Sequence, residues 1–334
     1  MWFLRNRTPH AAERNWTRDA QGVHWYIVAV RGTYAIGPEG QLSLEEEQLP
    51  PVLEPIHAGE PGRSSLLADS DLLERKPTTD VVVLGHAHAP KGKPVRSLTV
   101  GLRAGALEKE LVVYGNRVYY EGATGLATTA PAPFTQQPIT YELAFGGGDT
   151  SDPDPCRHRI DERNPVGRGF PAKGSRWNEQ PAHCIEHVGR DPATSGPAGF
   201  GPVDRSWLPR RTLAGTYDAA WLDTKMPLLP DDYDPRFGMS APTDQQSPEP
   251  FVGGERIGLT HMTPEGALLF ELPRLELRMS TQVRGREREH GAHMATVVVE
   301  PDLRRVSVTW QSALRVPAPD VDFVSVTDIT ARSA

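Results

Sequence analysis

Runs of β-branched and aromatic residues, bounded by turn residues, dominate the first third of the chain. Trp25–Tyr34 is rich in these types, and Ser97–Ala104 alternates apolar and polar positions as a half-buried strand does. Asp80–Ala89 begins with three valines and then alternates. In Lys109–Tyr120 two such runs flank Gly115 and Asn116, which tolerate the positive φ of tight turns. We therefore predict three strands and a hairpin.

The same pattern returns in the last third of the chain. Ala267–Leu272 and Leu275–Met279 are predicted strands separated by Pro273. Thr296–Glu300 and Val306–Trp310 flank a five-residue segment that begins with proline, so we expect another hairpin-like unit there.

Between residues 126 and 204 the periodic pattern disappears. The segment is rich in proline and holds three successive glycines at 146–148. Proline donates no hydrogen bond to a ladder, so we expect neither long strands nor long helices. The aromatic residues in this segment indicate ordered loops packed onto a core. Helix candidates along the chain are few and short, among them Leu213–Asp223.

These patterns predict a mainly β protein with antiparallel, sandwich-like or barrel-like sheets, long ordered loops rich in proline and glycine, and few short helices. We divide the chain into a β-rich subdomain at 1–125, a loop-rich segment at 126–204 packed on the core, and a β-rich subdomain at 205–334. Whether the β-rich parts form one architecture or two stays open at this point. The 31 glycines and 32 prolines exceed the average share, which agrees with many turns.

Charge and hydropathy exclude several classes of function. The net charge of −7 lacks the positive excess on which nucleic-acid binding mainly rests. The longest apolar run, Trp25–Val30, is far too short to cross a bilayer. Arg5 and Pro9 leave no apolar core for a signal peptide, so we expect a cytoplasmic protein. In that compartment Cys156 and Cys184 are most simply free thiols.

The sharpest chemical motif is H-x-x-E-H at His183, Glu186 and His187. On a helix the two histidines would share a face and bind zinc, with the glutamate as general base, as in one class of zinc peptidases. Pro181 and Gly189 leave barely two turns for such a helix. Loop or surface histidines are therefore the favoured interpretation, and a zinc-dependent hydrolase is the alternative function.

Other candidate ligands are weaker. His86 and His88 share one face of a predicted strand, with His57 as a possible third ligand. Cys156 and His158 do not form a standard zinc-finger spacing with the motif at 183–187. Ordinary surface or loop residues are favoured over a metal in both cases. The aspartate clusters at 149–154 and 231–234 lie beside prolines, which favours turn closure over calcium binding. No phosphate-binding or nucleophile motif is present.

Ordered sequence blocks span the chain from about residue 3 to 330, and together they are more specific than any single motif. The blocks are Leu4–Pro9, Glu13–Arg14, Val30–Tyr34, Gly59–Leu66, Ser70–Leu72, Lys76–Val81, Gly85–Pro90, Thr140–Gly147, Asn164–Phe170, Ala198–Pro202, Leu213–Asp218 with Trp221, and Pro227–Phe237. In this order they resemble a family of type VI secretion adaptors or chaperones, encoded beside toxin effectors and PAAR spike-tip proteins.

This resemblance implies a non-enzymatic role. The protein would hold a toxin effector in the producing cell and assist its docking onto the PAAR-tipped spike, with no cofactor, metal or catalytic residue carried over. His183 departs from the usual pattern of the family at 182–186, which weakens the zinc interpretation. Trp207, Trp221, Tyr233 and Phe237 cluster in the sequence and form a candidate partner-binding patch, although core anchors of the loop region are the favoured interpretation of these aromatics.

Overall fold

Three large sheets enclose one hydrophobic core in the computed structural model, which describes residues 2–123, 125–171 and 177–333. The strand order of the first sheet is β2-β3-β24-β23-β7, with β4 also paired to β3. The second has the order β1-β25-β21-β22 and the third β18-β10-β9-β19-β20. The first sheet consists of β2 (Ala11–Arg18), β3 (His24–Ile36), β4 (Leu42–Leu44), β7 (Asp80–Val83), β23 (His293–Glu300) and β24 (Arg305–Val316).

Most strand pairs in these sheets are antiparallel, and the parallel exceptions are β1 with β25 and β7 with β23. The prediction of a mainly β fold with few short helices is thereby confirmed. The second and third sheets consist of β1 (Phe3–Asn6), β21 (Leu275–Val283), β22 (Arg286–Gly291) and β25 (Val324–Ser333), and of β9 (Ser97–Ala104), β10 (Leu107–Tyr114), β18 (Ile185–His187), β19 (Arg256–Thr260) and β20 (Ala267–Glu271).

Strands from the first and the last third of the chain are neighbours in every large sheet. β3 pairs with β24, β1 with β25, and β9 with β19. The core between the sheets takes side chains from all three, such as Val28, Val100 and Leu277. Hydrogen-bonded ladders therefore join the two β-rich segments, whereas the boundaries at 125 and 204 stay predictions.

The predicted hairpin within Lys109–Tyr120 is wrong. β10 ends at Tyr114 and pairs with β9 and β18, whereas Tyr119 begins a separate strand. A Cβ on Gly115 would lie 1.8 Å from the carbonyl oxygen of Ala132, so this glycine permits a close backbone approach instead of a turn. The true hairpin joins β9 to β10 through Gly105, whose φ is +57°.

Two further predicted elements are interrupted. Asp80–Ala89 divides into β7 and β8 (His86–His88), which belong to different sheets. The predicted helix Leu213–Asp223 divides into a 3-10 turn and α2 (Ala219–Thr224). Gly215, with a φ of +84°, ends the first piece, and the Asp218 side chain caps the second.

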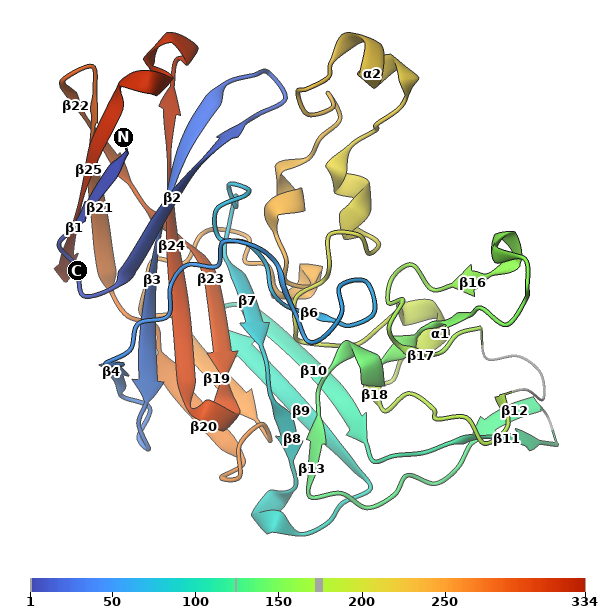
Figure 1. Ribbon diagram of the computed structural model, residues 1–334. Helices are drawn as coiled ribbons and strands as arrows, with labels where there is room; N and C mark the ends of the chain where they lie inside the picture. Colours follow the sequence, from blue (N-terminus) through green and yellow to red (C-terminus); the bar gives the residue numbers. More distant parts are fainter. Residues whose placement is uncertain (1, 124, 172–176, 334) are drawn as a thin grey trace.

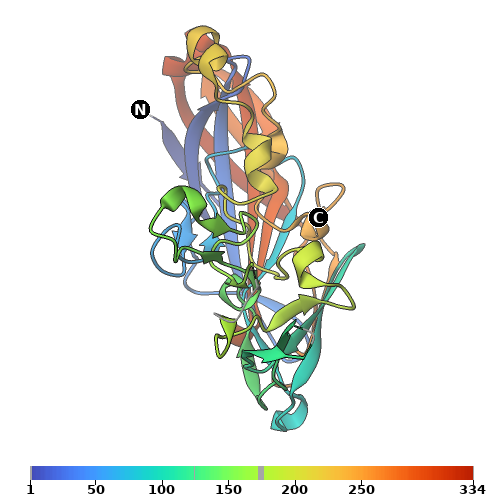
Figure 2. The ribbon, with the colours of Figure 1, turned by 90° about the vertical axis from the view of Figure 1, so that its right-hand side faces the viewer.

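The middle of the chain consists of short strands and turns, as predicted. Tyr141, Phe145 and Phe200 of this segment are buried, so its loops are packed onto the core. The segment lies on one side of the sheets, to the right in Figure 1 and in front in Figure 2. The remaining strands are β5 (Ile56–His57), β6 (Leu66–Ala68), β11 (Tyr119–Gly122), β12 (Gly125–Thr128), β13 (Gln136–Pro138), β14 (Phe145–Gly146), β15 (Gly148–Asp149), β16 (Arg159–Ile160) and β17 (Arg168–Gly169).

In the part of the chain that the structure describes, helical structure consists of short 3-10 segments and two short α-helices. Within the described ranges, no helix combines the length and apolar character that a membrane crossing requires. The helical segments are α1 (Pro192–Ser195), α2, and the 3-10 turns Pro90–Gly92, Tyr141–Leu143, Pro155–Arg157, Arg210–Ala214, Pro235–Gly238, Thr243–Gln245, Pro301–Leu303 and Ala318–Phe323.

Candidate partner-binding surface and polar sites

The first sheet is buried on both faces, and the face turned away from the main core is partly apolar and partly polar. Val306 and Val308 of β24 face the core, so the alternate residues Ser307, Thr309 and Gln311 point to the opposite face, where they are also buried. Gln311 accepts a hydrogen bond from the Lys76 backbone at 2.9 Å and donates to two backbone carbonyls of the 71–74 segment. A second, loop-built layer therefore covers this face and is attached to it by polar contacts.

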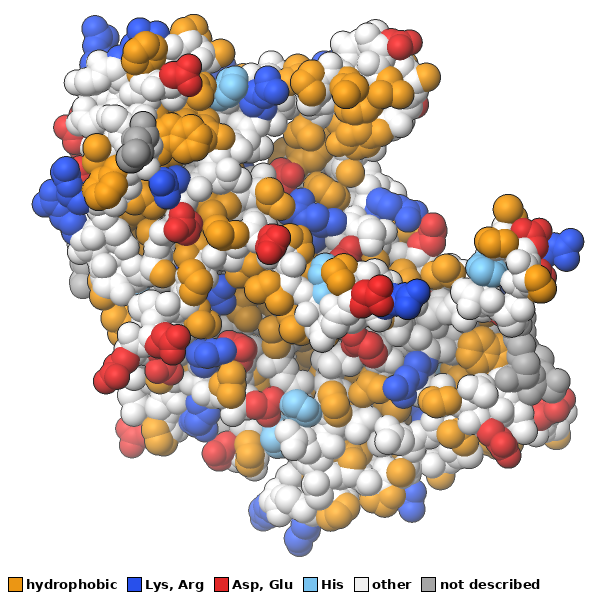
Figure 3. Space-filling model, in the orientation of Figure 1, with side chains coloured by type: hydrophobic (Ala, Val, Ile, Leu, Met, Phe, Trp, Pro, Cys, Tyr) orange, Lys and Arg blue, Asp and Glu red, His pale blue; other side chains and the backbone are white. Residues whose placement is uncertain are grey.

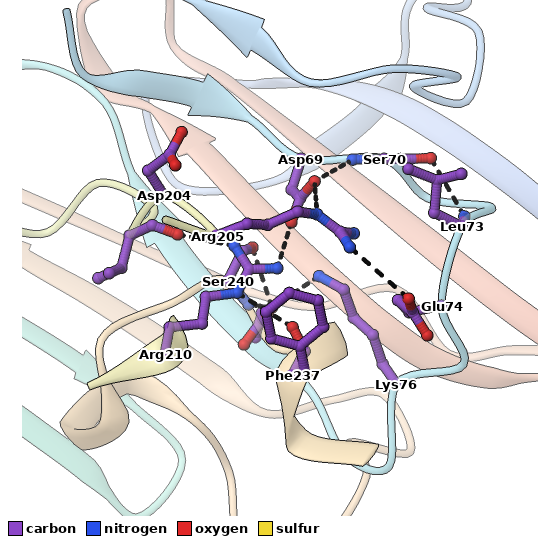
Figure 4. A network of polar contacts seen from close by, with 12 residues as sticks. Asp69, Ser70, Leu73, Glu74, Lys76, Asp204, Arg205, Arg210, Phe237 and Ser240 are labelled. Carbon is purple, nitrogen blue, oxygen red and sulfur yellow. Dashed lines mark hydrogen bonds and ion pairs between the residues drawn. The ribbon is translucent and has the colours of Figure 1, made fainter. Parts of the chain in front are cut away.

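A buried ionic network organises that layer (Figure 4). Asp69 accepts hydrogen bonds from Arg205 at 3.1 Å and from Arg210. Burial alone would raise the pKa of Asp69, but the two guanidinium groups outweigh this effect and lower it. Both guanidinium groups also lie over the Phe237 ring, 5.3 and 5.5 Å from its centroid. The Asp69 carboxylate and the Phe237 ring thus hold Arg205 and Arg210 in position.

A second ion pair joins the loop layer to the edge strand β7. The Lys76 ammonium donates to Asp80 at 2.6 Å and to Thr296 at 2.9 Å. The same Asp80 carboxylate accepts the backbone N–H of Ser240 at 2.7 Å, so β7 holds the 236–246 segment in place. Lys76 and Asp80 are both buried, and each therefore needs the other to offset the cost of leaving water.

This network forms the base of a projecting segment, residues 213–234, which we call the α2 arm (Figure 1). Its base is closed by a hydrogen bond from the Asp234 N–H to the Leu213 carbonyl at 2.9 Å. Thr216 is held by Asp232 through its backbone and its hydroxyl, at 2.9 and 2.7 Å. Tyr233 donates its hydroxyl to Glu74 at 2.7 Å. The α2 arm is thus an ordered loop with a fixed base.

The outer part of the α2 arm exposes large apolar side chains. Tyr217, Leu222 and Met226 are 52%, 56% and 62% exposed. Trp221 packs edge-on against Tyr217 with ring centroids 4.7 Å apart, and its indole N–H donates to the Leu228 carbonyl. Figure 3 shows hydrophobic side chains gathered on this part of the molecule. Such a cluster on a projecting element is typical of a protein-binding surface.

The structure separates the four predicted patch residues. Trp207 is 2% exposed and packs edge-on against Tyr141 in the core. Tyr233 and Phe237 contact each other and belong to the ionic network, whereas Trp221 alone lies on the outer α2 arm. The exposed Tyr217, Leu222 and Met226 beside Trp221 were not predicted. Their sequence signal is a group of large apolar side chains in and beside a helix that is too short to bury them.

The H-x-x-E-H residues do not converge on one point. Ile185–His187 is a strand, so the neighbouring Glu186 and His187 side chains point to opposite faces. His183 donates to Glu186 at 2.9 Å and is hydrogen-bonded to the Tyr119 hydroxyl at 3.0 Å, whereas His187 lies beside the Pro197 carbonyl. No group of three potential metal ligands occurs among the described residues. Metal analysis of the purified chain tests the zinc alternative directly.

Tyr119, His183 and Glu186 are hydrogen-bonded in series, and the order of these groups resembles that of a catalytic relay. Burial raises the pKa of Tyr119 to about 12, so its phenol stays protonated at neutral pH. Arg117 donates to both Glu186 and the His183 carbonyl, which neutralises the far end of the chain. The arrangement therefore acts as a hydrogen-bonded clamp between β11 and β18.

The remaining sequence candidates occupy separate places. His86 and His88 both bind the Asp302 carboxylate, at 2.8 and 2.7 Å, whereas His57 pairs with Asp204. Cys156 is exposed and Cys184 is buried, and both are free. The aspartate clusters close turns, as predicted. In these clusters Asp154 accepts the Cys156 N–H and Asp234 the Arg236 N–H, whereas Asp232 binds the distant Thr216 N–H.

Comparison with known proteins places the chain in one family. A family described as an uncharacterized protein conserved in bacteria (DUF2169) matches residues 21–311. The chain belongs to this family. The match includes most of both β-rich segments, the ionic network and the whole α2 arm. The comparisons with curated proteins and with solved structures found no match.

Proposed function

We propose that this chain is a cytoplasmic, non-enzymatic adaptor or chaperone. It binds a toxin effector of a type VI secretion system and assists its docking onto the PAAR-tipped spike. The ordered sequence blocks that resemble such adaptors support the identity of the partner. The exposed apolar cluster of the α2 arm is the observation that carries the binding role.

Energetics favour the α2 arm as the contact. Complete burial of a fully exposed large apolar side chain contributes about 1.5 to 3 kcal/mol. Covering the exposed parts of Leu222 and Met226, 56% and 62%, therefore supplies about 2 to 3.5 kcal/mol together. A few such anchors commonly dominate a protein interface. The α2 arm is held at its base by ion pairs and turn hydrogen bonds, so little ordering entropy opposes binding. An unloaded effector gains because its own apolar docking surface is covered.

The chemistry of the described polar sites also supports binding over catalysis. The buried ionic groups are paired with each other across separate segments, as in a structural network. These ionic groups hold loops in place beneath the α2 arm.

Co-expression with the effector encoded beside this chain tests the proposal. A variant carrying Leu222→Ser and Met226→Ser removes the apolar cluster without touching the ionic network. We expect it to lose co-purification with the effector and to leave more effector insoluble. Leu269→Ser with Leu303→Ser is the matched control, because both leucines are more than 60% exposed and lie outside the α2 arm. Equal effector recovery with both variants would refute the proposal.

A further inference from the structure

A cavity of about 370 Å³ lies at the base of the α2 arm. Its walls come from β10, from the turn around α1, and from the two segments that lead into and out of the α2 arm. Leu213 and Arg236, which flank the two ends of the α2 arm, both line it. A partner that covers the outer α2 arm would therefore lie close to the cavity mouth. The volume suits one or two inserted side chains.

The charges that face this cavity are mainly positive. Its described lining includes a single carboxylate, that of Asp244. The carboxylates that pair with three of the cavity arginines, Asp69, Asp161 and Asp234, are not part of the lining. Among the lining cations that form ion pairs, only Lys109 has its partner, Asp244, in the described cavity wall. The lining cations are Lys109, Arg163, Arg190, Arg210 and Arg236.

Some hydrogen-bond donors that line this cavity have no partner among the described residues. Arg190 is exposed and forms no ion pair with the described residues. The Ser195 hydroxyl is buried and lacks a hydrogen-bond partner within the described chain. Lys109 is fixed by Asp244 and Gln245, both at 2.8 Å, so its charge is held in position instead of moving with a flexible side chain. Preorganised donors of this kind favour an anionic group.

We infer that this cavity binds an acidic side chain of the partner segment that covers the α2 arm. This inference rests on the proposed function and specifies the chemistry of its partner. Guanidinium groups bind carboxylates through paired, charge-assisted hydrogen bonds. Arg190 is available for such a pair, and Arg236, whose Nε and Nη2 already bind Asp234, adds its charge and its remaining N–H groups. The α2 arm supplies apolar contact, and the cavity at its base selects for glutamate or aspartate nearby in the partner.

Fluorescence anisotropy with labelled pentaglutamate, pentaserine and pentalysine peptides tests the inference on the full chain. We expect pentaglutamate alone to bind at 50 mM salt. The variant Arg190→Gln with Arg236→Gln should weaken this binding at least tenfold. Arg103→Gln with Arg256→Gln is the matched control, because it removes the same charge from two exposed arginines outside the cavity. This control should bind as the unchanged chain does.

Three results would overturn the inference. They are no binding of pentaglutamate, equal weakening by the two double variants, and full displacement of the peptide by an equal concentration of inorganic phosphate, which would indicate a small-anion site only. The assay contains no effector, so it is independent of the proposed function. If pentaglutamate binds as expected but Leu222→Ser with Met226→Ser leaves effector recovery unchanged, the adaptor proposal fails while the acidic-peptide site stands.

Discussion

At the scale of single residues, the decisive contacts join positions that are far apart in the sequence. Asp69 and Arg210 are separated by 141 positions, yet they form the ion pair at the base of the α2 arm. Each residue type alone is ordinary on a protein surface, so no local pattern reveals such a partnership. The candidate histidines show the same limit, because His86 and His88 were predicted to share a face but their common partner Asp302 was not.

Replacing Asp69 tests how far the loop layer depends on its ion pairs. Asp69→Asn leaves Arg210 buried without a counter-charge, so we expect the free energy of unfolding to fall by about 3 to 5 kcal/mol. Urea unfolding measures this change. Asp152→Asn, which removes an exposed partner of Arg157, should cost only about 0.5 kcal/mol. Similar losses in both variants would show that the buried pair has no special weight.

The same variant should change the response to acid. The pKa of Asp69 lies below its ordinary value of 3.8 in the folded protein. Its stabilising contribution is therefore complete above pH 3.8 and is lost as the pH falls through the lower folded pKa. Asp69→Asn should remove this component of acid denaturation, which unfolding curves below pH 4 would detect.

His290 predicts a pH dependence of the same sign, at a higher pH. Burial lowers its pKa from 6.5 to about 4, and Thr281 hydrogen-bonds to its ring at 2.8 Å. Below pH 6.5 the unfolded chain takes up a proton that the folded protein resists. The free energy of unfolding should therefore decline between pH 6.5 and 4, by at most about 1.4 kcal/mol per pH unit. His290→Gln should flatten this slope, and an unchanged slope would contradict the assignment.

At the scale of elements, periodicity predicted strands well where their partners are close in sequence. β9 has the predicted bounds, and β23 and β24 form the predicted hairpin. The error at Lys109–Tyr120 has a physical cause. Gly115 and Asn116 satisfy the conformational needs of a turn, but the glycine is used for contact with Ala132, a distant residue. Local propensity cannot distinguish these two uses of glycine.

The short helix α2 depends on its cap more than on its length. Six residues form too short a helix to persist alone, and the Asp218 side chain satisfies the Trp221 N–H at 2.9 Å. Asp218→Ala should cost about 1 kcal/mol locally. We expect roughly fivefold faster hydrogen exchange at amides 219–224, with global unfolding unchanged. Asp191→Ala, which removes the corresponding cap of α1, should leave exchange in α2 as it was.

At the scale of the whole molecule, the sequence predicted the class of fold but not how its parts are joined. Alternating patterns specify which face of a strand is buried, and the mainly β fold follows from them. They do not specify that β24 lies between β3 and β23, because that order depends on long-range packing. The apolar α2 arm was missed for a related reason. Whether its apolar side chains are exposed or buried depends on which distant segments pack against them, and the local sequence does not specify this.

Shared sheets predict that the chain folds as one cooperative unit. A fragment of residues 1–204 would lack the strands that pair with β1, β3 and β9, and would expose apolar side chains of the common core. Such a fragment cannot bury enough apolar surface to offset its conformational entropy. We expect it to lack a cooperative transition in urea, measured by circular dichroism, whereas the full chain unfolds in a single step. A fragment with its own sharp transition would instead establish an independent subdomain ending near residue 204.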